Sequence, residues 1–190
     1  MADYDISTVE LDGDRYEVVQ SLVRNKYAVR DAAGNVVLRG KQKMLKLKEE
    51  FPFVDADGND AFTVKAGGIM DIAGNYAIVD AATGEDVVVL DEDYSLFAEN
   101  WTVRDPDTGA ALATIRSQNK LLEVLRHFVG AAGLIPHKYE IKDADGDHVG
   151  RISGQFSLKD KYTVTIDDAS DVPKEAVVAA ACVLDALEGS

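Results

Sequence analysis

The sequence predicts a mainly β (α+β) fold in which antiparallel strands close into a barrel around a buried hydrophobic C-terminal helix. Two observations lead to this prediction. A motif typical of β-hairpins recurs along the chain, and an unbroken apolar run occupies residues 176–184 near the C-terminus. A helix that is apolar on every side has no face for water, so we expect this run to lie in a core that the strands surround.

The recurring motif has an aromatic residue, an aliphatic residue two positions later, an Asp two positions after that, and a Gly shortly beyond it. Copies begin at Tyr27, Tyr76, Trp101 and Tyr139, with a shortened copy at Phe53. Alternation places the aromatic and aliphatic side chains on one face of a strand, the Asp opens a turn, and the Gly supplies the positive φ that closes it. These hairpins predict about ten or more strands, and a meander of that size tends to close.

Two segments depart from the strand pattern. Residues 119–129 place their apolar side chains on one helical stripe and are followed by Gly130, which predicts a surface helix ending at a glycine cap. The second segment begins after Ser170 or Asp171, either of which can cap a helix, and continues through Pro173 and the apolar run as far as Leu187. Its length is about 22 Å at 1.5 Å per residue, a fair match to the height of a small barrel.

The length of the chain indicates one domain, residues 1–190. Because the sequence shows no targeting signal, we expect the protein in the cytoplasm. The acidic N-terminal stretch lacks the basic and apolar regions of a secretory signal, and no apolar run approaches the length of a membrane span. The only cysteine, Cys182, lies inside the apolar run, so no intramolecular disulfide can form and a reducing compartment is suitable. We expect it to be a core residue, because a thiol in apolar surroundings is a poor nucleophile.

The charge balance is strongly acidic. With 34 Asp and Glu against 20 Lys and Arg, the net charge is −14, which opposes sequence-independent binding of nucleic acid, because that depends on basic side chains neutralising phosphates. One interpretation is adaptation of the whole surface to high salt, as in proteins from halophilic archaea, where self-repulsion is screened.

The order of these elements resembles the LURP-one-related family, which shares the fold of the Tubby C-terminal domain and of the phospholipid scramblases. The residues that carry the resemblance are the repeated hairpins, the segment 156–166 with Phe156 and Tyr162, and the C-terminal run 176–185. The resemblance covers about Tyr16 to Leu187. It implies a closed antiparallel barrel of about twelve strands around the C-terminal helix.

The same resemblance suggests functions without placing their residues here. Tubby proteins bind phosphoinositides or other membrane lipids, and scramblases move lipid between leaflets. The cysteine-rich, calcium-binding and membrane-anchoring segments of the scramblases have no counterpart in this sequence, which argues against scrambling. A fold of this kind specifies structure better than function.

One basic segment departs from the acidic background, and it gives the candidate ligand-binding residues Arg39, Lys41, Lys43, Lys46 and Lys48. Clustered basic side chains near a membrane attract anionic lipid, with each contributing about 1 kcal/mol, so this segment is a candidate anion site. The alternative is an edge strand protected by lysines, or a face paired with neighbouring acids.

The sequence offers no catalytic or metal site and no cofactor motif. The acidic stretches 55–58 and 143–147 do not meet the spacing of an EF-hand, so we interpret them as hairpin turns. His127, His137 and His148 fall in a predicted helix, loop and strand, with no carboxylate or second histidine at ligand spacing. No nucleophile elbow or phosphate-binding loop occurs.

These observations favour a non-catalytic intracellular protein that binds phospholipid headgroups or another anion. We expect a monomer in the cytoplasm, in contact with the membrane surface if lipid is the ligand, and no nucleic-acid partner. A protein-interaction scaffold without lipid binding, or an unassigned hydrolase with a polar cleft, are the alternatives. The identity of any protein partner does not follow from the sequence.

Overall fold

The computed structural model describes residues 4, 6–20, 27–40, 50–67, 75–95, 98–118, 138–155, 161–167, 172 and 174–188. For residues 93–95, 98–99 and 185–188 it describes the backbone alone. The expected helix at 119–129, the capping residues Ser170 and Asp171, and Pro173 lie outside the described residues.

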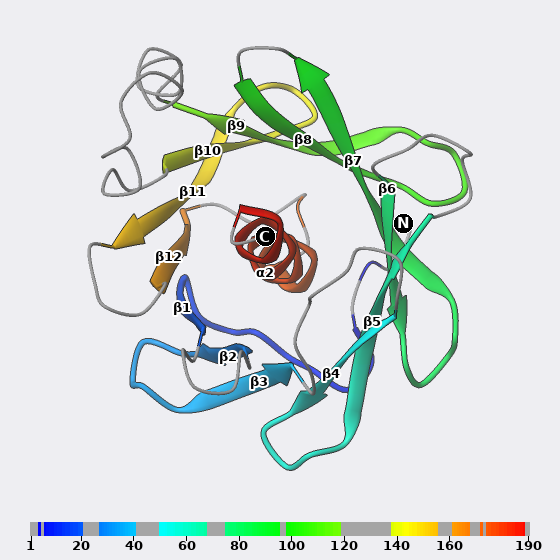
Figure 1. The fold of residues 1–190 in the computed structure, drawn as a ribbon, viewed down its shortest axis with the longest axis vertical. Helices are drawn as coiled ribbons and strands as arrows, with labels where there is room; N and C mark the ends of the chain where they lie inside the picture. The colour runs from blue at the N-terminus through cyan, green and yellow to red at the C-terminus, as the bar shows by residue number, and fades with distance from the viewer. Residues whose placement is uncertain are drawn as a thin grey trace.

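The described strands form a closed barrel in which every neighbouring pair is antiparallel (Figure 1). Each strand pairs with the next in the chain, and β1 pairs with β12 to close the ring. The strands are β1 (Arg15–Gln20), β2 (Tyr27–Arg30), β3 (Val36–Gly40), β4 (Phe51–Asp55), β5 (Asp60–Ala66), β6 (Asn75–Asp80), β7 (Asp86–Ser95), β8 (Ala98–Arg104), β9 (Ala111–Ser117), β10 (Lys138–Asp143), β11 (His148–Gln155) and β12 (Lys161–Ile166). The predicted closed barrel of about twelve strands is confirmed.

The hairpin turns form as the motif predicts. In the turn between β2 and β3, the backbone N–H of Asp31 donates to the carbonyl of Asn35 over 2.9 Å, and the Asp31 carboxylate accepts the backbone N–H of Asn35 at 2.8 Å. The glycine of every copy has a positive φ, which a side chain would strain. These glycines are Gly34 (88°), Gly58 (96°), Gly84 (74°), Gly109 (70°) and Gly146 (91°).

These turns all lie at the same end of the barrel. In an antiparallel meander the connections alternate between the two ends, and the Asp-Gly turns join β2 to β3, β4 to β5, β6 to β7, β8 to β9 and β10 to β11. Asp14, just before β1, and Asp167, just after β12, lie at this end too. One end of the barrel is therefore rich in carboxylates, and we call it the acidic end.

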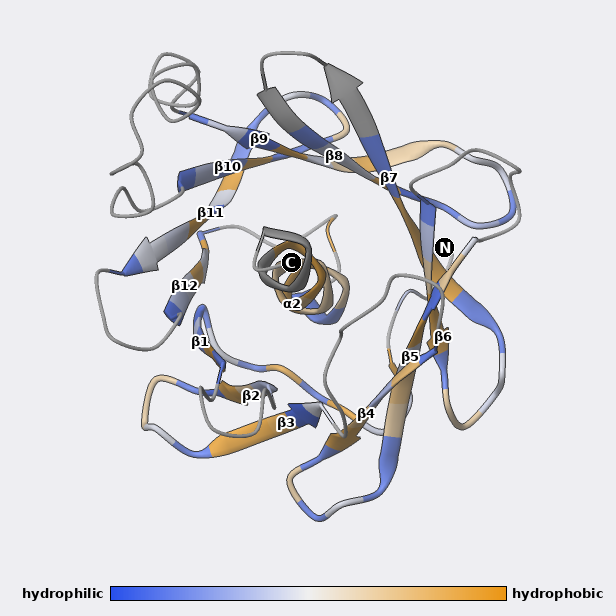
Figure 2. Ribbon diagram, in the orientation of Figure 1, coloured by the Kyte–Doolittle hydropathy of each residue, from blue (hydrophilic) through white to orange (hydrophobic). Residues whose placement is uncertain are grey.

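Helix α2 (Lys174–Glu188) lies inside the ring of strands, as predicted, and Figure 2 shows its hydrophobic residues at the centre of the barrel. Val178, Cys182 and Val183 are fully buried, so Cys182 is a core residue as expected. Inward-facing strand residues such as Val18 and Ile115 complete the core. Each fully buried aliphatic side chain stabilises the fold by about 1.5–3 kcal/mol relative to exposure.

The N-terminal segment, residues 4 and 6–14, packs against the barrel in a way that the sequence did not indicate. Ile6 and Leu11 are buried and belong to the same apolar core as α2. The backbone N–H of Leu11 donates to the Glu175 carboxylate over 2.9 Å, which links the segment to the first turn of α2. No described helix has the length and apolar content needed to cross a membrane.

Candidate functional site

The structure places one of the predicted anion-binding residues. Arg39 lies on β3 with its side chain exposed, between the inward-facing Leu38 and Gly40. One guanidinium N–H donates to the carbonyl of Ala56 in the turn after β4, over 2.8 Å. Lys41, Lys43, Lys46 and Lys48 lie outside the described residues.

The edge-strand alternative does not hold for Arg39. Strand β3 pairs with β2 on one side and with β4 on the other, so its backbone groups are used within the barrel. A closed barrel has no edge to protect. The hydrogen bond to Ala56 occupies one of the five N–H donors of a guanidinium, so Arg39 can also contact an anion from the outer surface.

The carboxylates of the acidic end are used to cap their own turns. Asp55 Oδ1 accepts three backbone N–H groups, from Asp57 at 2.9 Å, Gly58 at 2.7 Å and Asn59 at 2.8 Å. Asp143 Oδ1 accepts the backbone N–H of Asp147 at 2.8 Å. Among the described residues, no group of three or more His, Cys, Asp and Glu is arranged to hold a metal ion.

Two of the turn aspartates also hold the N-terminal segment. Tyr4 donates its hydroxyl to Asp105 Oδ2 over 2.6 Å, and the backbone N–H of Ser7 donates to Asp80 Oδ2 over 2.9 Å. The hydrogen bond from Tyr4, followed by the backbone N–H of Thr108, lowers the pKa of Asp105 to about 2. The same bond, followed by burial, raises the pKa of Tyr4 to about 12.

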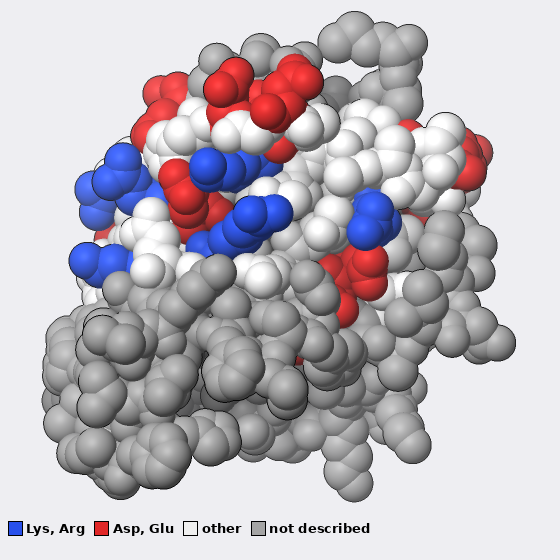
Figure 3. All heavy atoms as spheres, turned by 90° about the horizontal axis from the view of Figure 1, so that it is seen from above, with Lys and Arg blue, Asp and Glu red and all other residues white. Residues whose placement is uncertain are grey.

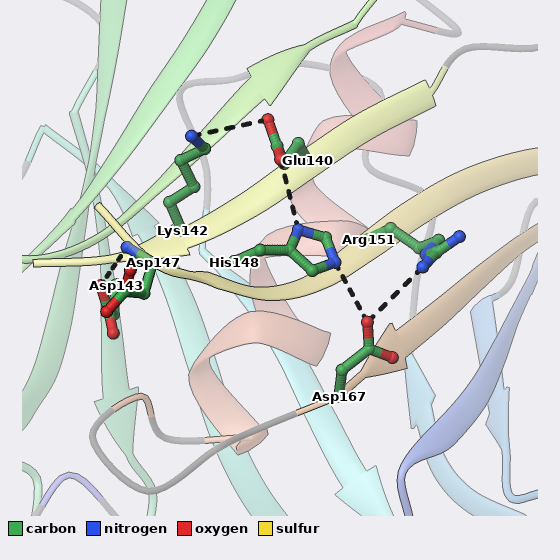
Figure 4. Close-up of polar contacts among 7 residues, drawn as sticks. All are labelled: Glu140, Lys142, Asp143, Asp147, His148, Arg151 and Asp167. Atoms are coloured by element: carbon green, nitrogen blue, oxygen red, sulfur yellow. Dashed lines mark hydrogen bonds and ion pairs between the residues drawn. The ribbon is translucent and has the colours of Figure 1, made fainter. Parts of the chain in front are cut away.

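A polar network that the sequence did not predict lies on the outer surface around His148 (Figure 4). His148 Nδ1 lies 3.3 Å from Glu140 Oε1, and His148 Nε2 lies 3.0 Å from Asp167 Oδ2. Arg151 approaches the same Asp167 oxygen at 3.5 Å, and Lys142 Nζ lies 4.0 Å from Glu140. The sequence places no carboxylate at ligand spacing beside His148, whereas strand pairing brings two carboxylates to its ring.

The geometry of this network limits its chemistry. The two carboxylates approach opposite nitrogens of the imidazole ring, so one metal ion could not bind both of them together with His148. A catalytic histidine would need one ring nitrogen directed at a nucleophile or substrate, whereas both nitrogens of His148 face carboxylates. The arrangement joins β10, β11 and the residue after β12.

This network is hard to predict from the sequence, because its residues come together only through strand pairing. His148 follows the turn at 143–147, and its register opposite Lys142 depends on an irregularity in the β10–β11 pairing. Asp167 arrives through a separate pairing, that of β11 with β12. His127 and His137 lie outside the described residues.

The outer face of the barrel near this network carries several basic residues. Figure 3 views the side that lies at the top of Figure 1, where β8, β9 and β10 run, and shows Lys and Arg interspersed with Asp and Glu, with more acids along the upper edge. Arg116 on β9 and Lys138 on β10 are both exposed and alternate with the buried Ile115 and Tyr139.

Comparison with known proteins gives one family and one fold. A family model described as LURP-one-related matches residues 36–185, from β3 into α2. An X-ray structure of a protein from Arabidopsis thaliana is similar to this chain with a TM-score of 0.59 and 11% sequence identity, covering 100% of this chain and 98% of that one. At this identity the likeness shows the fold alone. No curated protein sequence matches the chain.

Proposed function

The chain belongs to the LURP-one-related family, and we propose that it is a non-catalytic protein that binds an anionic ligand, such as a phospholipid headgroup, on the outer surface of its barrel. The observation that carries this proposal is the filled interior. Helix α2 and the inward-facing strand residues form one apolar core, in which Val178 and Ile115 are completely buried. A ligand must then meet the outside of the barrel.

The charges of the described residues narrow the place at which an anion could bind. The acidic end repels anions, because its turns carry Asp and Glu and the first turn of α2 carries Glu175. Salt screens charges beyond about 8 Å at physiological ionic strength, so local basic surfaces can act despite the net charge of −14. The proposed ligand-binding residues are Arg39, Lys41, Lys43, Lys46 and Lys48, of which Arg39 is exposed on the outer face.

The cellular setting follows from the ligand. A protein that binds lipid headgroups through basic side chains would act from the cytoplasm at the membrane surface, where anionic lipid is concentrated. We propose that it acts there as a monomer. The competing role is that of a scaffold that binds a protein partner. In that case the protein would not bind vesicles.

Sedimentation with liposomes that contain anionic lipid tests the proposal at the salt concentration where the protein is stable. Substitution of Lys41, Lys43, Lys46 and Lys48 by Gln should abolish co-sedimentation. A control with the same loss of charge elsewhere should retain it, and suitable positions, of which Arg15 is exposed and the others are partly exposed, are Arg15, Arg30, Lys65 and Lys174. Equal sedimentation of the two variants, or no sedimentation of the unmodified protein, would rule out lipid binding at this segment.

A further inference from the structure

The strand register gathers three cations on the outer face of β9, β10 and β11. Arg116 on β9 lies directly opposite Glu140 on β10, and Glu140 lies directly opposite Arg151 on β11. Lys138 is two residues before Glu140 on the same strand and the same face. It is therefore a diagonal neighbour of both arginines, at about 7–8 Å between Cα atoms, which long side chains can bridge.

Two of these cations are available for a ligand. The side chain of every other Lys or Arg that the structure describes makes a hydrogen bond or an ion pair, whereas the side chains of Arg116 and Lys138 make none with a described residue. Both side chains are exposed. Arg151 is also largely exposed, at 57%, and its only recorded partner is Asp167 at 3.5 Å.

The acids on this face are already engaged. Glu140 contacts His148 at 3.3 Å and Lys142 at 4.0 Å, and Asp167 contacts His148 at 3.0 Å as well as Arg151. The face thus carries more positive than negative charge in a protein whose overall charge is −14. Such an excess of positive charge is unexpected on a surface that contacts only solvent.

We propose that the outer face of β9, β10 and β11 is a second anion-binding site, at which Arg116, Lys138 and Arg151 bind a phosphate group. Guanidinium groups match the spacing of phosphate oxygens, and an ammonium adds a compact charge between them. The phosphate can belong to a soluble phosphate compound or to a lipid headgroup. This site is distinct from the segment of the proposed function, because β3 and β9 lie on opposite sides of the ring (Figure 1).

Glu140 has an opposing role in this site. Its carboxylate lies between the two arginines in the register and repels an incoming phosphate, although His148 and Lys142 partly neutralise it. Removal of its charge should therefore strengthen binding. Substitution of a residue with a purely structural role would not increase the affinity for phosphate.

Isothermal titration calorimetry with pyrophosphate tests the proposal on the full chain at low and physiological ionic strength. The double variant Arg116→Gln, Lys138→Gln should weaken pyrophosphate binding by about thirtyfold, since it loses two cations near the anion. Glu140→Gln should tighten binding by a few fold. The control Arg30→Gln, Lys65→Gln removes the same charge from β2 and β5 and should leave the affinity unchanged.

Vesicles of phosphatidylcholine with phosphatidic acid distinguish the two sources of phosphate. If the headgroup is the ligand, the Arg116 and Lys138 variant binds vesicles more weakly, in addition to its weaker pyrophosphate binding. If a soluble compound is the ligand, only pyrophosphate binding falls. Absence of pyrophosphate binding, or an affinity that falls equally in the control, would overturn the proposal. The proposed function is tested separately by the Lys41–Lys48 variant, so either can fail alone.

Discussion

The carboxylate of Asp80 binds Ser7 to the turn between β6 and β7 through hydrogen bonds, although 73 positions separate the two residues in the sequence. Asp80 Oδ2 accepts both the backbone N–H and the hydroxyl of Ser7, while Oδ1 accepts the backbone N–H of Ala82 at 2.7 Å. Burial alone would raise the pKa of Asp80, but the hydrogen bonds from Ser7 and from the turn outweigh it and lower the pKa. At the equivalent Asp31, the second oxygen instead accepts the Asn35 side chain.

Asp80→Asn should destabilise the protein by about 2 kcal/mol, since hydrogen bonds to a charged group are lost and an amide donor can be turned towards the Ser7 donors. Urea unfolding at neutral pH measures this change. The matched control is Asp31→Asn, at the same position of the exposed β2–β3 turn, where we expect a smaller loss. Equal losses would mean that Ser7 contributes nothing to holding the N-terminal segment.

Tyr4→Phe should reduce stability at neutral pH and change its pH dependence. The pKa of Asp105 is lowered to about 2, so its contribution is present above about pH 4 and is lost as the pH falls towards 2. The pKa of Tyr4 is raised to about 12, so its contribution is present below about pH 10 and is lost as the pH rises towards 12. The difference in stability between the unmodified protein and the Tyr4→Phe variant should therefore shrink at both low and high pH.

Urea unfolding over a series of pH values measures this difference. Asp107→Asn serves as the control, because Asp107 is exposed in the same turn and its backbone, not its side chain, makes the recorded bond to Asp105. A Tyr4→Phe protein whose stability tracks the unmodified protein in parallel at every pH would contradict the assignment.

Gly150→Ala should destabilise the barrel by about 3 kcal/mol, because overpacking a strand pair moves backbone. A Cβ at this position would lie 2.4 Å from the carbonyl oxygen of Thr165 on β12. Thermal unfolding measures the effect, and Ser153→Ala, an outward-facing position on the same strand, is the control. A melting temperature unchanged by Gly150→Ala would contradict the close packing of β11 and β12.

Val178→Asp should prevent folding, since it would place an unpaired carboxylate in the middle of the apolar core. The protein should be recovered without a cooperative thermal transition. Ala144→Asp adds the same charge in the exposed β10–β11 turn and should fold normally. A cooperatively melting Val178→Asp protein would exclude a central position for α2.

The parts of the fold that the sequence predicts are those encoded locally. A hairpin needs an alternating strand, an Asp and a Gly within a few residues, so the turn at Gly34 can be recognised without knowing its partners. The apolar run likewise identifies α2 as a core helix before any strand is placed. Closure of the ring through β1 and β12 follows from the number of strands and the resemblance to a barrel family.

The contacts that the sequence does not reveal depend on register and on distant partners. Asp80 and Asp31 occupy equivalent positions in the motif, yet only Asp80 binds the N-terminal segment. His148 gains Glu140 and Asp167 through two different strand pairings. For the candidate anion site, the sequence identified the segment that begins at Arg39, whereas the unpaired cations Arg116 and Lys138 become neighbours only when β9 meets β10.

We propose that ligands contact the outside of a barrel whose interior is filled. A ¹H–¹⁵N NMR titration of the full chain with inositol trisphosphate tests this most directly. We expect amide shifts to change at Arg39 and residues 41–48 and on the outer face of β9 to β11, while the amides of Val177 and Leu184 in α2 stay unchanged. Dominant changes in α2, or no changes at any basic position, would contradict it.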